Sequence, residues 1–152
     1  MYEGEKYSFI KSKRIGKGGN GAVYDVKIAE IDYPVVAKFF EYTGSDKETR
    51  YKRFKQEVDF VCNIGESDGI IPILDKKCPE GIPKTKDEAW FLMPKAETYK
   101  VNRRRKIVDK IDDMLRLANI IRILHKKNSG RKNFSATVFK NLIVLSCNFS
   151  YI

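Results

Sequence analysis

Alternating apolar and polar residues mark the first part of the chain as β-structure. Residues 7–14 and 22–28 alternate in this way, and residues 35–42 are rich in β-branched and aromatic side chains. Asn20 and Gly21 lie between the first two segments and indicate a hairpin turn, because both residues adopt positive φ readily. We therefore expect three consecutive strands, of which the first two form a hairpin.

Helical spacing follows these strands. Apolar side chains recur every three or four residues over residues 47–63, after the N-cap residues Ser45 and Asp46. Two further apolar runs, residues 70–74 and 89–93, predict two more strands with a Pro- and Lys-rich loop between them. The predicted order is three strands, one helix and two strands.

Beyond Pro94 the pattern becomes helical again. Apolar residues recur at helical spacing from Ile107 to His125, the only histidine, which we expect to be packed at the end of this helix. Residues 129–152 mix Ser, Asn and Lys with aromatic residues, and a short strand near Leu142 is the only element indicated there.

The net charge of +10 arises entirely in the last third of the chain. Residues 1–98 hold 17 basic and 17 acidic side chains, whereas residues 99–152 hold 13 and 3. A basic excess of this kind occurs in segments that bind nucleic acid or anionic membranes. A solvated basic face is the simpler interpretation, because no nucleic-acid recognition motif accompanies the clusters.

The cysteines and the chain ends narrow the class of protein. Cys62, Cys78 and Cys147 have no CxxC spacing, so they predict neither a disulfide framework nor a zinc site. Charged and polar residues follow Met1, which argues against a secretory leader, and the apolar run 142–147 is too short to span a bilayer. We expect a cytoplasmic chain with reduced thiols and a single domain core, or part of one.

Two motifs carry the candidate chemistry. Residues 15–23 read Ile-Gly-Lys-Gly-Gly-Asn-Gly-Ala-Val, and Lys38 ends the run Val-Val-Ala-Lys in the third predicted strand. The glycines precede a strand, whereas a dinucleotide-binding turn opens a helix, and the Gly-Lys-Ser/Thr of a Walker loop is absent. The pair of motifs resembles the nucleotide-binding half of a protein kinase.

This resemblance implies a site for ATP. In the family the glycines let the backbone approach the phosphates, the strand lysine binds the α and β phosphates, and apolar residues flank the adenine. Lys38 takes the lysine position, and Val36 stands where the family most often has Ala. The implied ATP-binding residues of these motifs are Ile15, Gly16, Lys17, Gly18, Gly19, Asn20, Gly21, Val23, Val36 and Lys38.

Glu57 resembles the glutamate that pairs with the strand lysine in the family. It lies beside the apolar stripe of the predicted helix, whereas Asp59 lies about 200° further round. We therefore expect an ion pair between Lys38 and Glu57 that supports the nucleotide site.

Residues 90–96, Trp-Phe-Leu-Met-Pro-Lys-Ala, resemble the last N-lobe strand and the hinge of a kinase. Met93 takes the gatekeeper position. The resemblance assigns the adenine amino group to the carbonyl of Pro94, which proline retains, and the ring nitrogen to the N–H of Ala96. Met93, Pro94 and Ala96 complete the implied cofactor-binding set.

The resemblance covers residues 7–128 and implies an α+β fold. This fold is a kinase-like N-lobe, a five-stranded antiparallel sheet with the αC helix, followed by the hinge and the αE-like helix of an incomplete C-lobe. The implied parts are residues 1–93 as the N-lobe, residues 94–128 as the hinge and the start of the C-lobe, and residues 129–152 as a tail without the family pattern.

The catalytic motifs of the family are missing. No Asp or Glu occurs from Met114 to Ile152, although a kinase needs a hydroxyl-orienting Asp and a metal-binding Asp there. A register that places Asn141 at the metal-binding Asn puts Ala136 at the catalytic Asp. No catalytic residue and no metal site can be identified, and Mg²⁺ is expected with ATP only if the missing C-lobe is present.

Three functions remain open on the sequence. The first is the ATP-binding portion of a Ser/Thr protein-kinase-like domain, truncated or frameshifted near Asn128 and unable to transfer phosphate to protein. The second is a non-catalytic, pseudokinase-like sensor or scaffold, with an exposed apolar surface of the helix over residues 107–124 and the tail as the contact for a protein partner. The third, a minor alternative, is a basic nucleic-acid-binding module.

Overall fold

The computed structural model describes residues 1–64, 70–96 and 106–128. The strand expected near Leu142 therefore lies outside the described residues. The chain divides into two compact units. The first comprises Met1–Asn63 and Pro72–Lys95, and the described part of the second consists of Ile64, Ile70, Ile71, Ala96 and residues 106–128.

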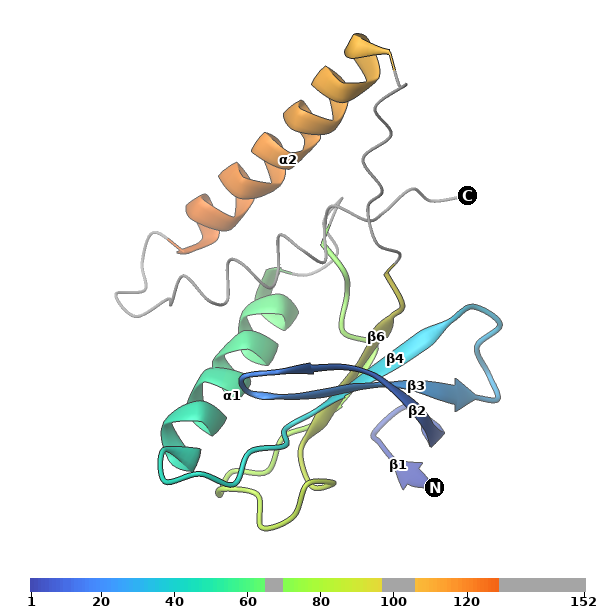
Figure 1. The fold of residues 1–152 in the computed structure, drawn as a ribbon, viewed down its shortest axis with the longest axis vertical. Helices are drawn as coiled ribbons and strands as arrows, with labels where there is room; N and C mark the ends of the chain where they lie inside the picture. Colours follow the sequence, from blue (N-terminus) through green and yellow to red (C-terminus); the bar gives the residue numbers. More distant parts are fainter. Residues whose placement is uncertain (65–69, 97–105, 129–152) are drawn as a thin grey trace. The chain divides into compact units, whose positions relative to one another are not determined.

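A six-stranded antiparallel sheet forms the first unit (Figure 1). Its strand order is β1-β2-β3-β4-β6-β5, so β4 lies inside the sheet and the short strands β1 and β5 lie at its edges. The strands are β1 (Tyr2–Glu3), β2 (Ser8–Gly18), β3 (Gly21–Ile28), β4 (Val35–Phe39), β5 (Asp75–Lys77) and β6 (Trp90–Pro94).

The hairpin expected at Asn20 and Gly21 is present between β2 and β3. Gly18 pairs with Gly21, which leaves Gly19 and Asn20 as a two-residue loop. Gly21 is therefore the first residue of β3 rather than part of the loop, and packing requires a glycine there, because a Cβ at this position would overlap the carbonyl oxygen of Phe39 on β4. The close approach of β3 and β4 thus depends on a residue without a side chain.

Side chains alternate between two faces of the sheet. One face, which we call the cluster face, carries a buried hydrophobic cluster, and Phe9 contacts Trp90 there edge to face at 4.7 Å between ring centroids. Its buried members are Phe9, Val26, Ile28, Val35, Ala37, Phe39, Trp90 and Leu92.

The opposite face, which we call the helix face, packs against α1 (Lys47–Ile64). Phe54 of α1 is fully buried between Phe40 and Phe91, with ring centroids 5.6 and 5.5 Å away. Tyr51 lies 5.2 Å from Phe40 and donates a hydrogen bond from its hydroxyl to the carbonyl of Pro79. These aromatic contacts fix the helix on β4 and β6.

Two edge strands differ from the expected pattern. The strand expected at residues 70–74 lies at Asp75–Lys77 instead. Pairing with β6 begins only at Leu74, which donates its N–H to the Leu92 carbonyl. Pro72 in the expected segment has no N–H to donate. The strand β1 was not expected, and backbone N–H groups of Lys6 and Tyr7 just after it donate to the buried carboxylate of Asp75.

The second unit contains α2 (Ile107–Asn128). Its range includes the helix that the sequence predicted from Ile107 to His125. Ile120 and Leu124 are buried, whereas the apolar residues of its first half are largely exposed. The packing expected for His125 is wrong, since the residue is exposed. In the described part of the chain, neither helix has the length and apolar character that a bilayer crossing requires.

Candidate functional site

Lys38 and Glu57 form the expected ion pair in the first unit. The Nζ atom of Lys38 lies 2.6 Å from Oε1 of Glu57, and the two side chains are only 14% and 5% exposed. Lys38 also lies over the ring of Phe91 at 5.5 Å from the centroid. Asp59, the competing acid, is exposed and pairs instead with Lys76 at 3.8 Å.

The local sequence explains how the two charges meet. Lys38 alternates with Ala37 and Phe39, whose side chains belong to the cluster face, so the lysine points to the helix face. Glu57 lies one turn after Phe54 on α1, and the packing of Phe54 against the sheet brings this turn over β4. A buried acid on the helix therefore meets a partly buried base on the strand.

The helix face carries, besides Lys38, the expected residues Val23, Val36 and Met93. Val23 is paired with Lys38, and Val36 is paired with Met93 one row further along. Val36 and Met93 are buried. Pro94 ends β6 opposite Val35.

Three expected residues lie at more open positions. Ala96 is half-buried and follows Pro94 by two residues, in the second unit. Ile15 is 45% exposed, and Lys17 is exposed.

The glycine-rich turn lies at the β2–β3 hairpin with open space around part of its backbone. A Cβ at Gly16 would meet only Val23, at an ordinary 3.8 Å, and a Cβ at Gly18 would meet no atom closer than 4.0 Å. The backbone of Gly16 and Gly18 is therefore accessible to a ligand, whereas Gly21 is occupied by its contact with β4.

Arg50 of α1 reaches this turn, a contact that the sequence reading missed. Its Nη1 donates a 2.7 Å hydrogen bond to the carbonyl of Gly19, and its Nε donates a 2.8 Å bond to Oδ2 of Asp46. The guanidinium also lies over the ring of Tyr42, whose hydroxyl donates to Asp46. The spacing of four residues between Asp46 and Arg50 could have predicted their ion pair. No sequence pattern predicts the contact between Arg50 and Gly19.

Lys95 is a second residue that the sequence reading missed. It donates from Nζ to Oδ1 of Asp25 at 2.7 Å and from its backbone N–H to the carbonyl of Pro34 at 2.8 Å. The chain leaving β6 is thereby attached to β3 and to the start of β4.

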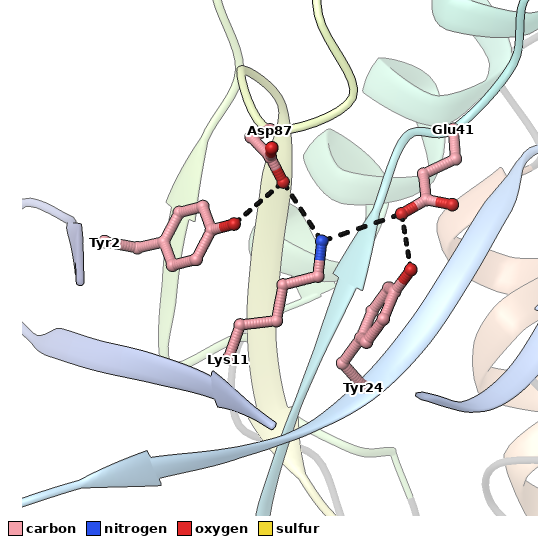
Figure 2. A network of polar contacts seen from close by, with 5 residues as sticks. All are labelled: Tyr2, Lys11, Tyr24, Glu41 and Asp87. Atoms are coloured by element: carbon pink, nitrogen blue, oxygen red, sulfur yellow. Dashed lines mark hydrogen bonds and ion pairs between the residues drawn. The ribbon is translucent and has the colours of Figure 1, made fainter. Parts of the chain in front are cut away.

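A polar network lies on the cluster face, away from Lys38. Figure 2 shows Lys11 between two carboxylates, with Nζ 3.0 Å from Asp87 and 3.7 Å from Glu41. Tyr2 donates to Asp87 at 2.8 Å, and Tyr24 donates to Glu41 at 2.7 Å. Lys11 also lies 4.1 Å from the ring centroids of Tyr24 and Phe39.

The network shifts the acidities of its members. Burial, together with the Asp87 carboxylate, raises the pKa of Tyr2 to about 12. Burial would raise the pKa of Asp87, but hydrogen bonds from Lys11 and Tyr2 outweigh it and lower that pKa. Every charged group here has a partner, so the network serves to hold β1, β2 and the segment before β6 together.

The first unit also contains a hollow of about 620 Å³ formed by the N-terminal segment, α1 and β5. Two ion pairs line it, Lys55 with Glu80 at 3.1 Å and Lys76 with Asp59 at 3.8 Å. Burial raises the pKa of the Cys78 thiol to about 11, so this thiol is not an active nucleophile near neutral pH. Within the described residues, no group of three His, Cys, Asp or Glu side chains is arranged to hold a metal ion.

Comparison with known proteins finds similarity in structure rather than in sequence. No protein-family model and no curated protein sequence matches the chain. Among solved structures, the chain is similar to the autoinhibited serine kinase domain of the giant muscle protein titin, with a TM-score of 0.55 and 14% identity over 78% of this chain and 36% of that one. It is also similar to the kinase domain of M. tuberculosis PknI, with a TM-score of 0.52 and 14% identity over 84% of this chain and 51% of that one.

The chain thus spans between about a third and a half of the length of these kinase domains. The mixed α+β architecture, with its curled antiparallel sheet and two helices, corresponds to the N-lobe side of those neighbours. The expected fold is confirmed: this chain has a protein-kinase-like fold.

Proposed function

We propose that this chain is the ATP-binding portion of a Ser/Thr protein-kinase-like domain and that it binds the nucleotide without transferring phosphate to protein. The observation that carries the proposal is the largely buried ion pair between Lys38 and Glu57. Lys38 lies on β4, next to the β2–β3 hairpin, and shares its sheet face with Val23, Val36 and Met93.

The residues present fit a nucleotide. Lys38 has three N–H donors, and among the described residues its hydrogen bonds include one acceptor, Glu57. The other donors suit phosphate oxygens, and the open backbone at Gly16 and Gly18 lets a phosphate approach closely. Val23 is half-buried and offers apolar surface to the adenine, and the buried Val36 is the proposed lining residue beneath it. The Pro94 carbonyl and the Ala96 N–H are the proposed backbone groups for the polar edge of the adenine.

The proposed lack of phosphotransfer rests on the acids that the chain does not have. Phosphoryl transfer gains its rate from positioning the acceptor hydroxyl and from charge stabilisation by bound metal ions. Both require carboxylates, and the sequence has none from Met114 to Ile152. Asp109, Asp112 and Asp113 belong to the first half of α2 and do not supply the missing motifs.

A nucleotide titration tests the proposal. We expect ATP to bind the wild-type chain and Lys38→Ala to weaken binding at least about tenfold, because one charge-assisted contact contributes about 1.5–3 kcal/mol. Lys52→Ala is the matched control, since Lys52 is an exposed lysine on α1, and it should change the affinity less than about twofold. Equal losses in the two variants, or no binding by the wild type, would contradict an ATP site at Lys38.

A second measurement addresses turnover. Incubation with labelled ATP, magnesium and a generic protein substrate should leave the substrate unlabelled. Incorporation that disappears in Lys38→Ala would show that the chain is an active kinase with a base outside the family motifs.

A non-catalytic scaffold is the second candidate, and the exposed apolar residues of α2 favour it. The coding DNA beyond codon 128 separates it from a truncated kinase. Kinase catalytic motifs in another reading frame would indicate a frameshift, whereas their absence from every frame would favour the scaffold.

A further inference from the structure

We propose that Arg50 is a positioning residue for the glycine-rich turn, holding it in the conformation that receives the phosphates of the nucleotide. This inference rests on the proposed ATP site, but its first consequence, an ordered turn, can be measured without any nucleotide.

The geometry around Arg50 is that of a fixed connector. A guanidinium group is planar and presents its N–H donors in set directions. Here Nη1 donates to the Gly19 carbonyl at 2.7 Å, while Nε donates at 2.8 Å to Asp46, the residue just before α1. The ring of Tyr42 lies 4.2 Å from the guanidinium carbon, and the Tyr42 hydroxyl donates to the same Asp46 carboxylate. The Asp46 carboxylate and the Tyr42 ring therefore fix the orientation in which the Arg50 guanidinium meets the Gly19 carbonyl.

The turn benefits from such a contact because of its composition. Gly18, Gly19 and Gly21 give it unusual conformational freedom, and ordering a glycine costs more entropy than ordering any other residue. A turn that is ordered before binding does not pay this cost when the ligand arrives. The two residues are close, since a Cβ at Gly19 would lie 3.3 Å from Nη1 of Arg50.

Helix α1 links this contact to Lys38. Arg50 and Glu57 are seven residues apart on α1, which corresponds to about 10 Å along the axis. Phe54 lies between them and packs against Phe40 and Phe91 of the sheet. One helix therefore positions both the turn, through Arg50, and the lysine, through Glu57.

Hydrogen exchange of the nucleotide-free protein tests the hold on the turn. We expect Arg50→Ala to speed exchange of the backbone amides of residues 16–21, with Arg50→Lys intermediate, because a lysine ammonium on its flexible stem lacks the planar fork that fixes the direction of the arginine donors. Arg53→Ala is the matched control: it removes an exposed arginine three residues along the same helix and should leave these amides unchanged. Unchanged exchange in Arg50→Ala, or an equal change in Arg53→Ala, would overturn the proposal.

Ligand titrations then test positioning against simple charge attraction. Arg50→Ala should weaken ATP about fivefold, the effect of one ordinary hydrogen bond, and leave adenosine, which has no phosphate, unaffected. Arg53→Ala should change ATP affinity less than about twofold. Equal weakening of ATP by both variants would mean that Arg50 acts only as a charge and would overturn the positioning role. If the wild type does not bind ATP but Arg50→Ala still speeds exchange in the turn, the ATP site fails while the hold of Arg50 on the turn stands.

Discussion

The ammonium of Lys38 and the carboxylate of Glu57 lie 2.6 Å apart in a largely buried position. The stability of the protein should therefore be sensitive to the loss of either residue. Removing one member of a buried pair leaves the other charge without compensation, which typically costs about 3–5 kcal/mol. The same pair contributes little net stability compared with two apolar residues, because burying both charges is itself costly. The pair therefore agrees better with the proposed nucleotide site than with a role in stability.

Glu57→Ala should lower the free energy of unfolding by about 3 kcal/mol, the low end of that range because Lys38 keeps some exposure. The double variant Lys38→Met with Glu57→Leu should recover most of the loss, since no unpaired charge remains. Asp59→Ala should cost less than about 1 kcal/mol, as expected for an exposed acid whose lysine partner is 3.8 Å away. Urea unfolding measures all three, and similar values for Glu57→Ala and Asp59→Ala would refute the distinction.

Tyr2 should make stability depend on alkaline pH. Its folded-state pKa is raised to about 12 from the ordinary value of 10, so the unfolded chain loses this proton first. The contribution is fully present below pH 10 and is lost as the pH rises toward 12. Tyr2→Phe should therefore lower the melting temperature at pH 7, where the bond to Asp87 is lost, and reduce the difference between pH 9 and pH 11. An unchanged alkaline slope in the variant would show that Tyr2 does not cause it.

At the scale of elements, β3 and β4 approach so closely that Gly21 admits no side chain. Gly21→Ala should cost about 2 kcal/mol, because the added methyl overlaps the Phe39 carbonyl and forces the strands apart. Gly16→Ala, with a tolerable 3.8 Å contact to Val23, should change stability by less than about 0.5 kcal/mol. Thermal unfolding compares them, and equal effects would mean that the hairpin adjusts freely.

The central elements could be predicted because their signals are local. Alternation placed Lys38 on one face of its strand, the stripe of α1 placed Glu57 beside it, and Asn20 and Gly21 marked the hairpin. The edges could not be predicted in this way. Two-residue β1 is held by Tyr2 and Asp87, 85 residues apart, and the position of β5 depends on Asp75 accepting N–H groups from Lys6 and Tyr7.

The candidate site shows the same division. Its motif residues were found from short patterns in the sequence, whereas the contact of Arg50 with Gly19 joins positions 31 apart. No local sequence pattern at either residue predicts a contact with the other. Contacts of this kind become visible only when the helix has been placed on the sheet.

On the scale of the molecule, α2 exposes apolar residues that the sequence reading expected to be exposed. These residues are between 50% and 74% exposed, and they are Ile107, Val108, Ile111, Met114 and Leu115. Contiguous apolar surface of this kind binds hydrophobic dyes and favours association.

The double variant Ile111→Lys with Met114→Lys should therefore reduce dye fluorescence and light scattering. Ile82→Lys, at an exposed position in the first unit, is the control and should change neither. A wild-type chain that is monomeric and gives negligible dye signal would show that this face is covered in solution.

The packing of Gly21 against Phe39 also bears on how such chains drift in evolution. A descendant that stopped using nucleotide would still be selected to keep Gly21, because the fold requires it. Lys38 and Glu57 would have no such protection, since we expect two apolar residues to replace them with little loss of stability. Among diverging copies of this chain, Lys38 and Glu57 should therefore be lost before Gly21. The presence of the lysine and the glutamate is for this reason stronger evidence for a ligand site than the presence of Gly21.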